Sequence, residues 1–389
     1  MASASASGAA AGARGALREI ARAMVTGDDT GVARACEGVD HALLLALAAE
    51  HRMVGVAGVV LDRVGAGVLP ATSWAQWQAA RRDAAASALV AAGELSQLFA
   101  MFAAAGVPAI AYKGPALALE AYGDLGLRPC VDLDVVVAPS HFTLARAALL
   151  SGGYASRLGM GLVQEAVVFA GQGHAEYALP SAGLPFVELH WRFAAQRLPW
   201  SPKVEDVIAR ARRVGIAGHD VPIPCDEDQL LLLAWHGTRH AWAQLEWLVA
   251  LGVFLARPID AAAVLRRAER HGGARALLVG VSAAAAVLRV ALPDAFAVAA
   301  ARDARVAQAV RAMVAPWLAS ADATPRASVV ERQLLERRRD VLRYHAARLL
   351  LPTKREWSLV RLPAVLTPCY VPIRLARLAL RGPAREDDE

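Results

Sequence analysis

Hydrophobic side chains recur at helical spacing over most of this chain and at strand spacing only in a central segment. Residues 16–65 show the helical pattern, with a break at the glycine and two aspartates of residues 27–29. Ser73 and Gln76 then have the spacing of a capping box, which predicts the start of a long alanine-rich helix that Gly106 can end. Helical spacing returns after residue 200 and continues to about residue 350.

Between the two helical stretches, short apolar runs alternate with polar and turn-forming residues, as in a small β-sheet. One helix is expected among them, near residues 140–150. Candidate strands lie at residues 108–113, 131–138, 164–170, 174–179 and 185–193. The chain is therefore expected to be an α+β protein, with a small mixed β-sheet core flanked by N- and C-terminal helical regions. The expected divisions are a disordered low-complexity tail at 1–15, an N-terminal helical region at 16–106, the α/β core at 107–200, a C-terminal helical region at 201–350 and a basic proline-containing tail at 351–389.

Two aspartates interrupt the most apolar of these strands. Side chains alternate between the two faces of a strand, so Asp132 and Asp134 share one face. Their neighbours Val131, Leu133 and Val135 are then expected to point into a core. Two ionised carboxylates about 7 Å apart along a strand repel each other unless a cation lies between them. Mg²⁺, which binds one or two carboxylates together with substrate phosphates, suits such a pair, whereas the alternative is a surface strand with two solvated aspartates.

A second feature lies upstream, where Tyr112, Lys113 and Gly114 follow a short strand and Pro115 begins a helix. A helix N-terminus after a glycine turn presents free backbone N–H groups and the positive end of the helix dipole, which together can bind a phosphate. Lys113 can add a positive charge at the same place. A single Lys-Gly pair is much less specific than a complete phosphate-binding loop.

The candidate strand at 185–193 also alternates cleanly between polar and apolar residues. Glu188, His190 and Arg192 share one of its faces, and the apolar residues between them share the other. An acid, an imidazole and a guanidinium on one face suit a third metal ligand beside phosphate-binding groups. The alternative is an amphipathic edge strand whose polar face meets water.

Together these motifs resemble the uncharacterised nucleotidyltransferase family of the DNA-polymerase-β-like superfamily. The resemblance is strongest over residues 108–137 and 186–193, and it extends more loosely from about residue 90 to residue 380. The similar positions are Tyr112-Lys113-Gly114, Tyr122-Gly123-Asp124, Arg128, Asp132 to Val137, Glu188 to Arg192, His236, His240, Trp242 and Leu245 to Leu248.

The resemblance implies an enzyme with a nucleotidyltransferase-like core, in which Asp132, Asp134 and Glu188 are catalytic and coordinate Mg²⁺ or Mn²⁺. The metal would hold an NTP, with ATP as the first expectation, and a nucleotidyl group would pass to an acceptor with release of pyrophosphate. The acceptor can be a small molecule, a peptide or a protein. The nucleotide-binding residues implied are Lys113, Gly114, Arg128 and Arg192. The residues expected behind the metal ligands or on the acceptor side are His190, His236 and His240.

Two positions depart from the pattern of the relatives. Pro115 follows Gly114 where the superfamily usually has serine, and Ala250 stands where an acid is expected. These departures leave two alternatives open. One is a non-catalytic binding protein that keeps the fold to contact a partner, and the other is phosphoryl transfer from the same site.

Composition narrows the choice of partner and compartment. The chain has 389 residues, enough to bury a sizeable core in two or three domains. Its net charge of +6 agrees with anionic substrates but is too small to indicate long nucleic acid, so none is expected. Cys36, Cys130, Cys225 and Cys369 are widely separated and show no C-x-x-C spacing, so reduced thiols and a cytoplasmic location are expected.

The histidines and tryptophans of the C-terminal helical region allow more than one interpretation. His236 and His240 are four residues apart and can share a helix face, as zinc ligands do, but no third ligand accompanies them in sequence. Core packing, or contact with the nucleotide or acceptor, is therefore preferred. Trp235, Trp242 and Trp247 are expected in the core and not in a base-stacking platform.

Two apolar segments raise the question of a membrane. Residues 276–292 are nearly apolar and reach the short limit for a span, but their alanine content and Arg289 favour a buried helix. Residues 354–382 mix apolar side chains with arginines, as in a helix on an anionic membrane surface. Prolines at 363, 368 and 372 interrupt such a helix, so packing against the protein is preferred and peripheral membrane contact is the alternative.

Overall fold

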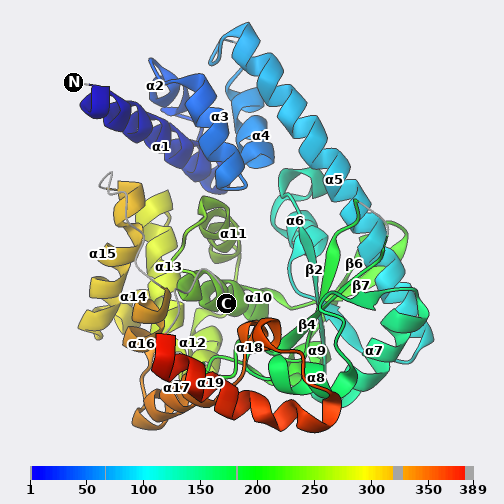
Figure 1. The fold of residues 1–389 in the computed structure, drawn as a ribbon. Coiled ribbons are helices and arrows are strands. Elements are labelled where there is room, and N and C mark those ends of the chain that lie inside the picture. The colour runs from blue at the N-terminus through cyan, green and yellow to red at the C-terminus, as the bar shows by residue number, and fades with distance from the viewer. Residues whose placement is uncertain (1, 66, 181–182, 319–326, 382–389) are drawn as a thin grey trace.

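A five-stranded mixed sheet lies at the centre of the α/β part of the molecule (Figure 1). The computed structural model describes residues 2–65, 67–180, 183–318 and 327–381. The strands are β1 (Ala109–Ala111), β2 (Asp132–Val137), β3 (Ala155–Ser156), β4 (His174–Ala178) and β5 (Phe186–His190). Their order is β1-β2-β5-β4-β3, in which β2 and β5 are parallel and all other neighbours are antiparallel. This small mixed sheet in a mainly helical chain confirms the predicted α+β class.

The two faces of the sheet meet different neighbours. Leu133, Val135 and Val137 of β2 belong to a core shared with α5 (Ala71–Ala104) and α7 (Phe142–Ser151). Val136 points the other way, into a larger core formed by the helices. Asp132 and Asp134 are therefore on the face turned toward the helices, as strand alternation predicts. The prediction that Val131 points into a core is wrong, because this residue precedes the strand and is 59% exposed.

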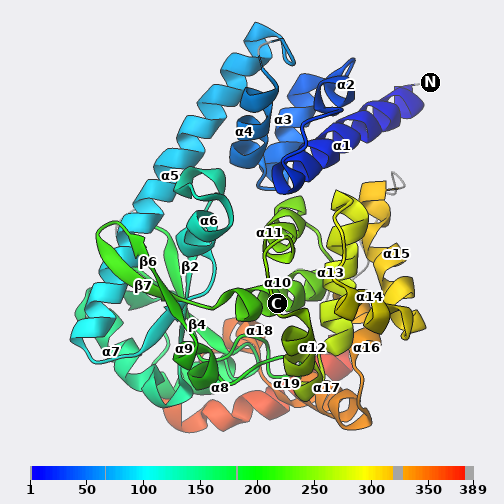
Figure 2. The ribbon, with the colours of Figure 1, turned by 180° about the vertical axis from the view of Figure 1, so that it is seen from behind.

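The helices before and after the α/β part share one hydrophobic core (Figures 1 and 2). The N-terminal helices are α1 (Ala2–Thr26), α2 (Val32–Cys36), α3 (His41–Glu50) and α4 (Val54–Val64). The C-terminal helices are α10 (Asp226–Arg239), α11 (Leu245–Leu255), α12 (Ala261–Arg270), α13 (Ala274–Leu288), α14 (Asp294–Ala301), α15 (Ala304–Leu318) and α16 (Ala327–Leu334). Helix α1 packs against α11, α13 and α15, so the helices before and after the sheet form one helical body.

Two predictions for the N-terminal region are wrong. Apart from residue 1, which lies outside the described residues, the expected disordered tail at 1–15 is helical, because α1 begins at Ala2 and Ala13 is completely buried. A run of alanine has high helix propensity and lets neighbouring helices approach closely, which explains the order. Ser73 does not cap a helix, because α5 already begins at Ala71 with Pro70 at its N-cap.

Three predictions for the sheet region also need correction. The expected strand at 164–170 is helix α8 (Leu162–Val168), since a short apolar run cannot be assigned to strand or helix by spacing alone. The short strand β3 was not predicted. The region at 201–350 is not wholly helical: after α9 (Val204–Ala209) it contains a hairpin of β6 (Arg212–Ile216) and β7 (His219–Ile223). The two turn residues of this hairpin, Ala217 and Gly218, both have positive φ, as a tight hairpin requires.

The C-terminal segment packs under the sheet, as preferred from the sequence (Figure 1). Its elements are α17 (Arg338–Leu350), α18 (Lys354–Leu359), the 3-10 turn η3 (Ala364–Cys369) and α19 (Tyr370–Arg381). Trp357 and Tyr370 are buried in the core of the sheet, and Lys354 forms an ion pair with Glu176 of β4. The remaining 3-10 turns of the α/β part are η1 (Leu125–Leu127) and η2 (Pro139–His141).

Glu356 holds this segment together and makes its stability depend on pH. The fully buried carboxylate accepts from Arg377 at 2.5 Å and from Arg374 at 3.4 Å, and it also accepts from the backbone N–H of Thr353 at 2.7 Å. Burial opposes ionisation, but the bond from Arg377 and the bonds from Thr353 lower the pKa of Glu356 below its ordinary value of 4.5. Glu356 therefore stabilises the fold above pH 4.5, and this contribution is lost as pH falls toward the lowered pKa. Replacing Glu356 by Gln is expected to cost about 2 kcal/mol at pH 7, and less near pH 3, by urea denaturation at the two pH values. An equal loss at both would contradict this role.

The apolar helices bear on the question of a membrane. Helix α13 is buried on most of its surface, which confirms a buried helix for residues 276–288 of the apolar run; the helix ends at Leu288, before the last four residues of the run. Judged by length and composition, one helix of the described chain, α5, could cross a membrane, but half of its most apolar stretch is buried inside the protein. The core helix of a soluble protein passes the same test, so α5 is weak evidence for a span.

Candidate active site

Three carboxylates meet on the face of the sheet that is turned toward the helical body. Asp132 and Asp134 lie on β2, and Glu188 lies on β5, directly opposite Asp134 in the parallel pairing of the two strands. Asp134 is 3% exposed, whereas Asp132 and Glu188 are half-buried. The two-residue period of β2 and the register between β2 and β5 thus bring together the residues that were predicted to bind a metal.

Two cationic side chains neutralise part of this acidic cluster. Lys113 Nζ and His190 Nε2 both lie 3.0 Å from Asp134 Oδ1, and His190 Nε2 is also 3.1 Å from Glu188 Oε2. Burial opposes the charge of His190, but its hydrogen bonds to the two carboxylates raise its pKa to about 9, so the ring is an imidazolium near pH 7. His190 and Lys113 therefore provide positive charge where the carboxylates converge.

The same contacts separate the pKa values of the carboxyl groups. For Asp134, burial alone would favour the neutral acid, but Lys113 and His190 bring its pKa well below the ordinary value. Burial likewise opposes the ionisation of Glu188, but the hydrogen bond from His190 lowers its pKa to about 2. Asp132 has a raised pKa because it is buried and faces the charge of Asp134. Asp132 is therefore the carboxyl group of the cluster whose negative charge the surroundings favour least.

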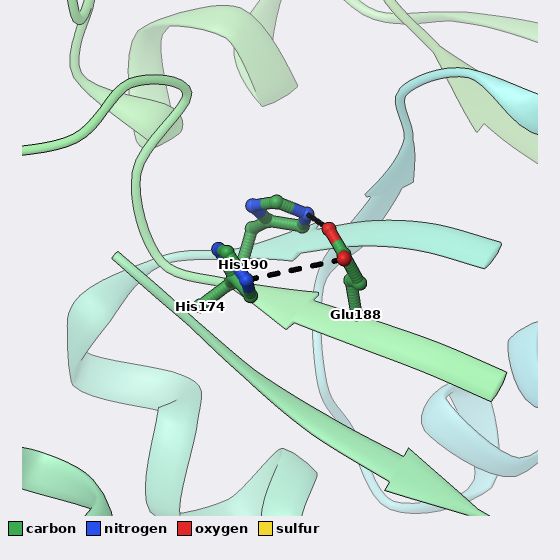
Figure 3. Close-up of side chains that lie close together, drawn as sticks. All are labelled: His174, Glu188 and His190. Atoms are coloured by element: carbon green, nitrogen blue, oxygen red, sulfur yellow. Dashed lines mark hydrogen bonds and ion pairs between the residues drawn. The ribbon is translucent and has the colours of Figure 1, made fainter. Parts of the chain in front are cut away.

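A second histidine beside His190, which was not predicted, completes a group of side chains that could hold a metal (Figure 3). His174 begins β4 and pairs with His190 across the strands, and its Nε2 lies 3.9 Å from Glu188 Oε1. Burial, together with the neighbouring His190, lowers the pKa of His174 to about 3, so this imidazole is neutral. Each of His174, Glu188 and His190 offers one ligand atom, and these atoms lie within 4.8 Å of one another. The clue in the sequence was the position of His174 at the start of a predicted strand.

The loop after β1 supplies Lys113 and leads into α6 (Gly114–Tyr122). The backbone N–H of Tyr112 donates to the carbonyl of Asp134 at 3.1 Å, which holds this loop beside the carboxylates. Gly114 has φ of +57°, and a Cβ there would lie 3.3 Å from Cys130 Sγ, so the turn favours glycine. Pro115 occupies the first turn of α6, where its missing N–H removes a donor that the helix does not need.

Arg128 lies in a buried ion pair at the edge of the cavity. Its Nε is 3.0 Å from Oε1 of Glu246 on α11, and the hydroxyl of Tyr122 donates to the same oxygen at 3.0 Å. Arg128 and Glu246 are 4% and 0% exposed. Arg128 was predicted to bind nucleotide. In the structure it pairs with Glu246, and this pair joins the α/β part to the helices. Ala250, where an acid was expected, is completely buried one turn further along α11.

A cavity of about 260 Å³ opens above the carboxylates. Its far wall is formed by the helical body, through His236, Arg239, His240 and Trp247. The rings of His236 and His240 are 4.7 Å apart, and both contact Trp247. Burial is the main cause that brings the pKa values of both histidines well below the ordinary value. The positive charge of Lys113 lowers the pKa of His236 further, and that of Arg239 lowers the pKa of His240, so both rings are neutral. These two residues, predicted on the acceptor side, do face the carboxylates across the cavity.

Other predictions for the cavity can be placed in the same way. Arg192 lines the cavity, and its Nε donates to the carbonyl of Ala194 at 3.4 Å. The group of three potential metal ligands found among the described residues is His174, Glu188 and His190, and it does not include His236 or His240. Trp235 and Trp242 are buried in the core as predicted, whereas Trp247 packs against that core and also lines the cavity.

A comparison with protein families identifies this arrangement. The model of the uncharacterised nucleotidyltransferase family matches residues 37–289, which is more than half of the chain. The chain belongs to this family. A search of curated proteins and a search of solved structures each found no match. The matched segment contains the whole sheet, the carboxylates and helices α10 to α13, and it ends before α14.

In this member of the family, the carboxylate cluster offers a donor set that fits a divalent cation. Nucleotidyltransferases generally use divalent metals. Asp132, Asp134 and Glu188 provide carboxylate oxygens, the ligands that Mg²⁺ and Mn²⁺ prefer, and a bound dication would offset the repulsion between Asp132 and Asp134. His174 is neutral and adds a nitrogen donor beside Glu188, and His190 could add a second one only after losing its proton, which would widen the choice toward softer metals such as Mn²⁺ or Zn²⁺. The geometry therefore supports a metal site without fixing the identity of the ion.

Proposed function

We propose that this nucleotidyltransferase is a metal-dependent enzyme that transfers a nucleotidyl group from an NTP, with ATP as the first candidate, to an acceptor that is a small molecule, a peptide or a protein. The observation that carries the proposal is the convergence of Asp132, Asp134 and Glu188 at a cavity that also contains Lys113. Carboxylates that repel one another, beside a cationic side chain and a helix N-terminus, suit a metal-bound triphosphate.

Each residue of the cluster has a role in this proposal. Asp132 and Asp134 hold a Mg²⁺ or Mn²⁺ ion, which when bound supplies positive charge to the phosphates. Lys113 and the start of α6 at Gly114 neutralise the triphosphate. Glu188 is either a third ligand or the base that accepts the proton of the acceptor. The acceptor oxygen attacks the α-phosphorus, the bond from that phosphorus to the bridging oxygen breaks, and pyrophosphate leaves.

Nucleotide binding tests the proposal before any acceptor is known. We expect calorimetry to show Mg²⁺-dependent binding of at least one NTP to the wild-type protein. Binding should be lost in the Asp132→Ala/Asp134→Ala double variant, whose fold is checked by its thermal melting. The exposed Asp83 of α5 provides a matched control, because Asp83→Ala removes an acid far from the cluster and should leave binding unchanged. A folded wild-type protein that binds no NTP would overturn the proposal and leave the non-catalytic alternative.

The products separate nucleotidyl transfer from phosphoryl transfer. Nucleotidyl transfer from ATP attaches AMP and releases pyrophosphate, whereas phosphoryl transfer attaches phosphate and releases ADP. The residues of the cluster can support either reaction, because both need a metal-bound triphosphate. We expect pyrophosphate, and release of ADP in proportion to a phosphorylated product would assign the other reaction.

A further inference from the structure

A second, smaller recess lies beside the cavity and is lined by arginines. Its volume is about 80 Å³, and it shares Gln172, His174 and Arg239 with the main cavity. We call this the arginine recess, after its guanidinium-bearing residues Arg197, Arg239, Arg348 and Arg374. Among the described residues that line it there is no carboxylate. His174 connects the recess with the carboxylates, since its imidazole lines both spaces and lies 3.9 Å from Glu188.

The arginines are held in place by contacts behind the recess. Arg197 makes two bonds to Glu331 of α16, at 2.8 and 2.9 Å, and Arg239 Nε lies 3.9 Å from the same carboxylate. Arg374 donates to the backbone carbonyl of Arg348 at 2.5 Å. Burial and the nearby Arg197 lower the pKa of Arg239, which shows that positive charges are crowded here. Arg197 and Arg374 also bind the carboxylates of Glu331 and Glu356, and positively charged guanidinium groups fixed in this way around a small space are suited to attract a carboxylate or phosphate through charge-assisted hydrogen bonds.

The order of the strands places the recess opposite the side where the triphosphate is expected. Lys113 and α6 follow β1, the carboxylates lie on β2 and β5, and His174 begins β4. Across the sheet, Lys113 is thus followed by the carboxylates, then by His174, and then by the arginine recess. In an in-line displacement, the attacking group and the leaving pyrophosphate lie on opposite sides of the phosphorus atom. With the triphosphate on the Lys113 side, the acceptor approaches from the side of the recess.

We propose that the arginine recess binds an anionic group, phosphate or carboxylate, of the acceptor, so that the nucleotidyl group is transferred to an anionic molecule. This inference rests on the proposed function. Two of the four arginines, Arg348 and Arg374, come from the C-terminal segment, outside the residues 37–289 matched by the family. The recess therefore combines a shared catalytic core with a specificity element from α17 and α19 of this chain.

Titration with inorganic phosphate tests the recess in the full-length protein. Wild-type protein is titrated by calorimetry without metal, and again with saturating Mg²⁺ and ATP. We expect phosphate to bind in both conditions, and Arg348→Gln to weaken this binding about tenfold, as expected for losing one charge-assisted hydrogen bond. Arg339→Gln is the matched control, because Arg339 lies on the same helix with its side chain 75% exposed. Arg239→Gln is the second variant if Arg348→Gln melts at a lower temperature. A parallel titration with acetate separates a carboxylate from a phosphate preference.

Each outcome has a distinct meaning. If phosphate binds equally strongly to the Arg348→Gln and Arg339→Gln variants, the recess is not an anion site. If phosphate competes with Mg²⁺-ATP and Arg348→Gln weakens the binding of both, the recess binds the triphosphate. This result would overturn the acceptor role. Phosphate binding in a protein that binds no NTP would refute the proposed function, and the acceptor role with it. Simultaneous binding that depends on Arg348 would support the proposal.

Discussion

Replacing Asp134 by Asn is expected to weaken Mn²⁺ binding at least about 100-fold, a larger loss than second-layer changes at metal sites usually cause. Asp134 is 3% exposed, lies opposite Glu188, and contacts both Lys113 and His190. The substitution removes one negative charge while both cations remain, so the cluster attracts a dication less strongly. The paramagnetism of Mn²⁺ allows the free ion to be counted by electron spin resonance, independently of any acceptor.

Asp83→Asn provides the control for this measurement, because the exposed Asp83 on α5 changes the charge of the protein by the same amount. Mn²⁺ binding by Asp134→Asn within about threefold of the wild type would place the metal elsewhere. In that case the group of His174, Glu188 and His190 would be the remaining candidate among the described residues.

The second large effect is expected at the buried pair of Arg128 and Glu246. Glu246→Leu should lower the free energy of unfolding by about 3–5 kcal/mol, because it leaves the guanidinium of Arg128 buried without its carboxylate. The hydroxyl of Tyr122 loses its acceptor in the same variant. Urea denaturation followed by tryptophan fluorescence measures the change.

A double variant separates the missing partner from the new leucine. Arg128→Met/Glu246→Leu removes both charges, and we expect it to recover most of the lost stability, since two apolar side chains can replace a buried ion pair. A double variant as unstable as Glu246→Leu would show that packing around α11, and not the unpaired Arg128, causes the loss.

The part of the site that depends on short sequence distances could be predicted, and the part that depends on distant contacts could not. The alternation within β2 and β5 was enough to place Asp132, Asp134 and Glu188 on one face. His174 reaches the same face only because β4 pairs with β5, and spacing along the chain carries no information about that pairing. Arg128 meets Glu246 across a separation of 118 residues, so its partner was not apparent.

The fold shows the same division. The α+β class follows from apolar spacing, because a helix and a half-buried strand each impose a period on the sequence. The hairpin of β6 and β7 was missed because its strand face is largely polar, with Arg212 and Arg213 at its start. Helix α8 was mistaken for a strand because its short apolar run has no clear period; in the structure Leu162 and Val163 are exposed and Val168 is buried. In both cases tertiary contacts decide the structure.

The shared core of the first and last helices has a consequence for how the protein folds during synthesis. Side chains of α1, such as Leu17 and Ile20, lie in the same core as Met313 of α15 and Tyr344 of α17. A ribosome releases the N-terminal helices long before the residues that cover them, so their apolar faces remain exposed until nearly the whole chain has emerged. The contacts that close this core span most of the sequence, which makes its formation a late and slow event. We therefore expect the candidate active-site cavity, whose far wall is built on α10 and α11 of that core, to be completed late in folding.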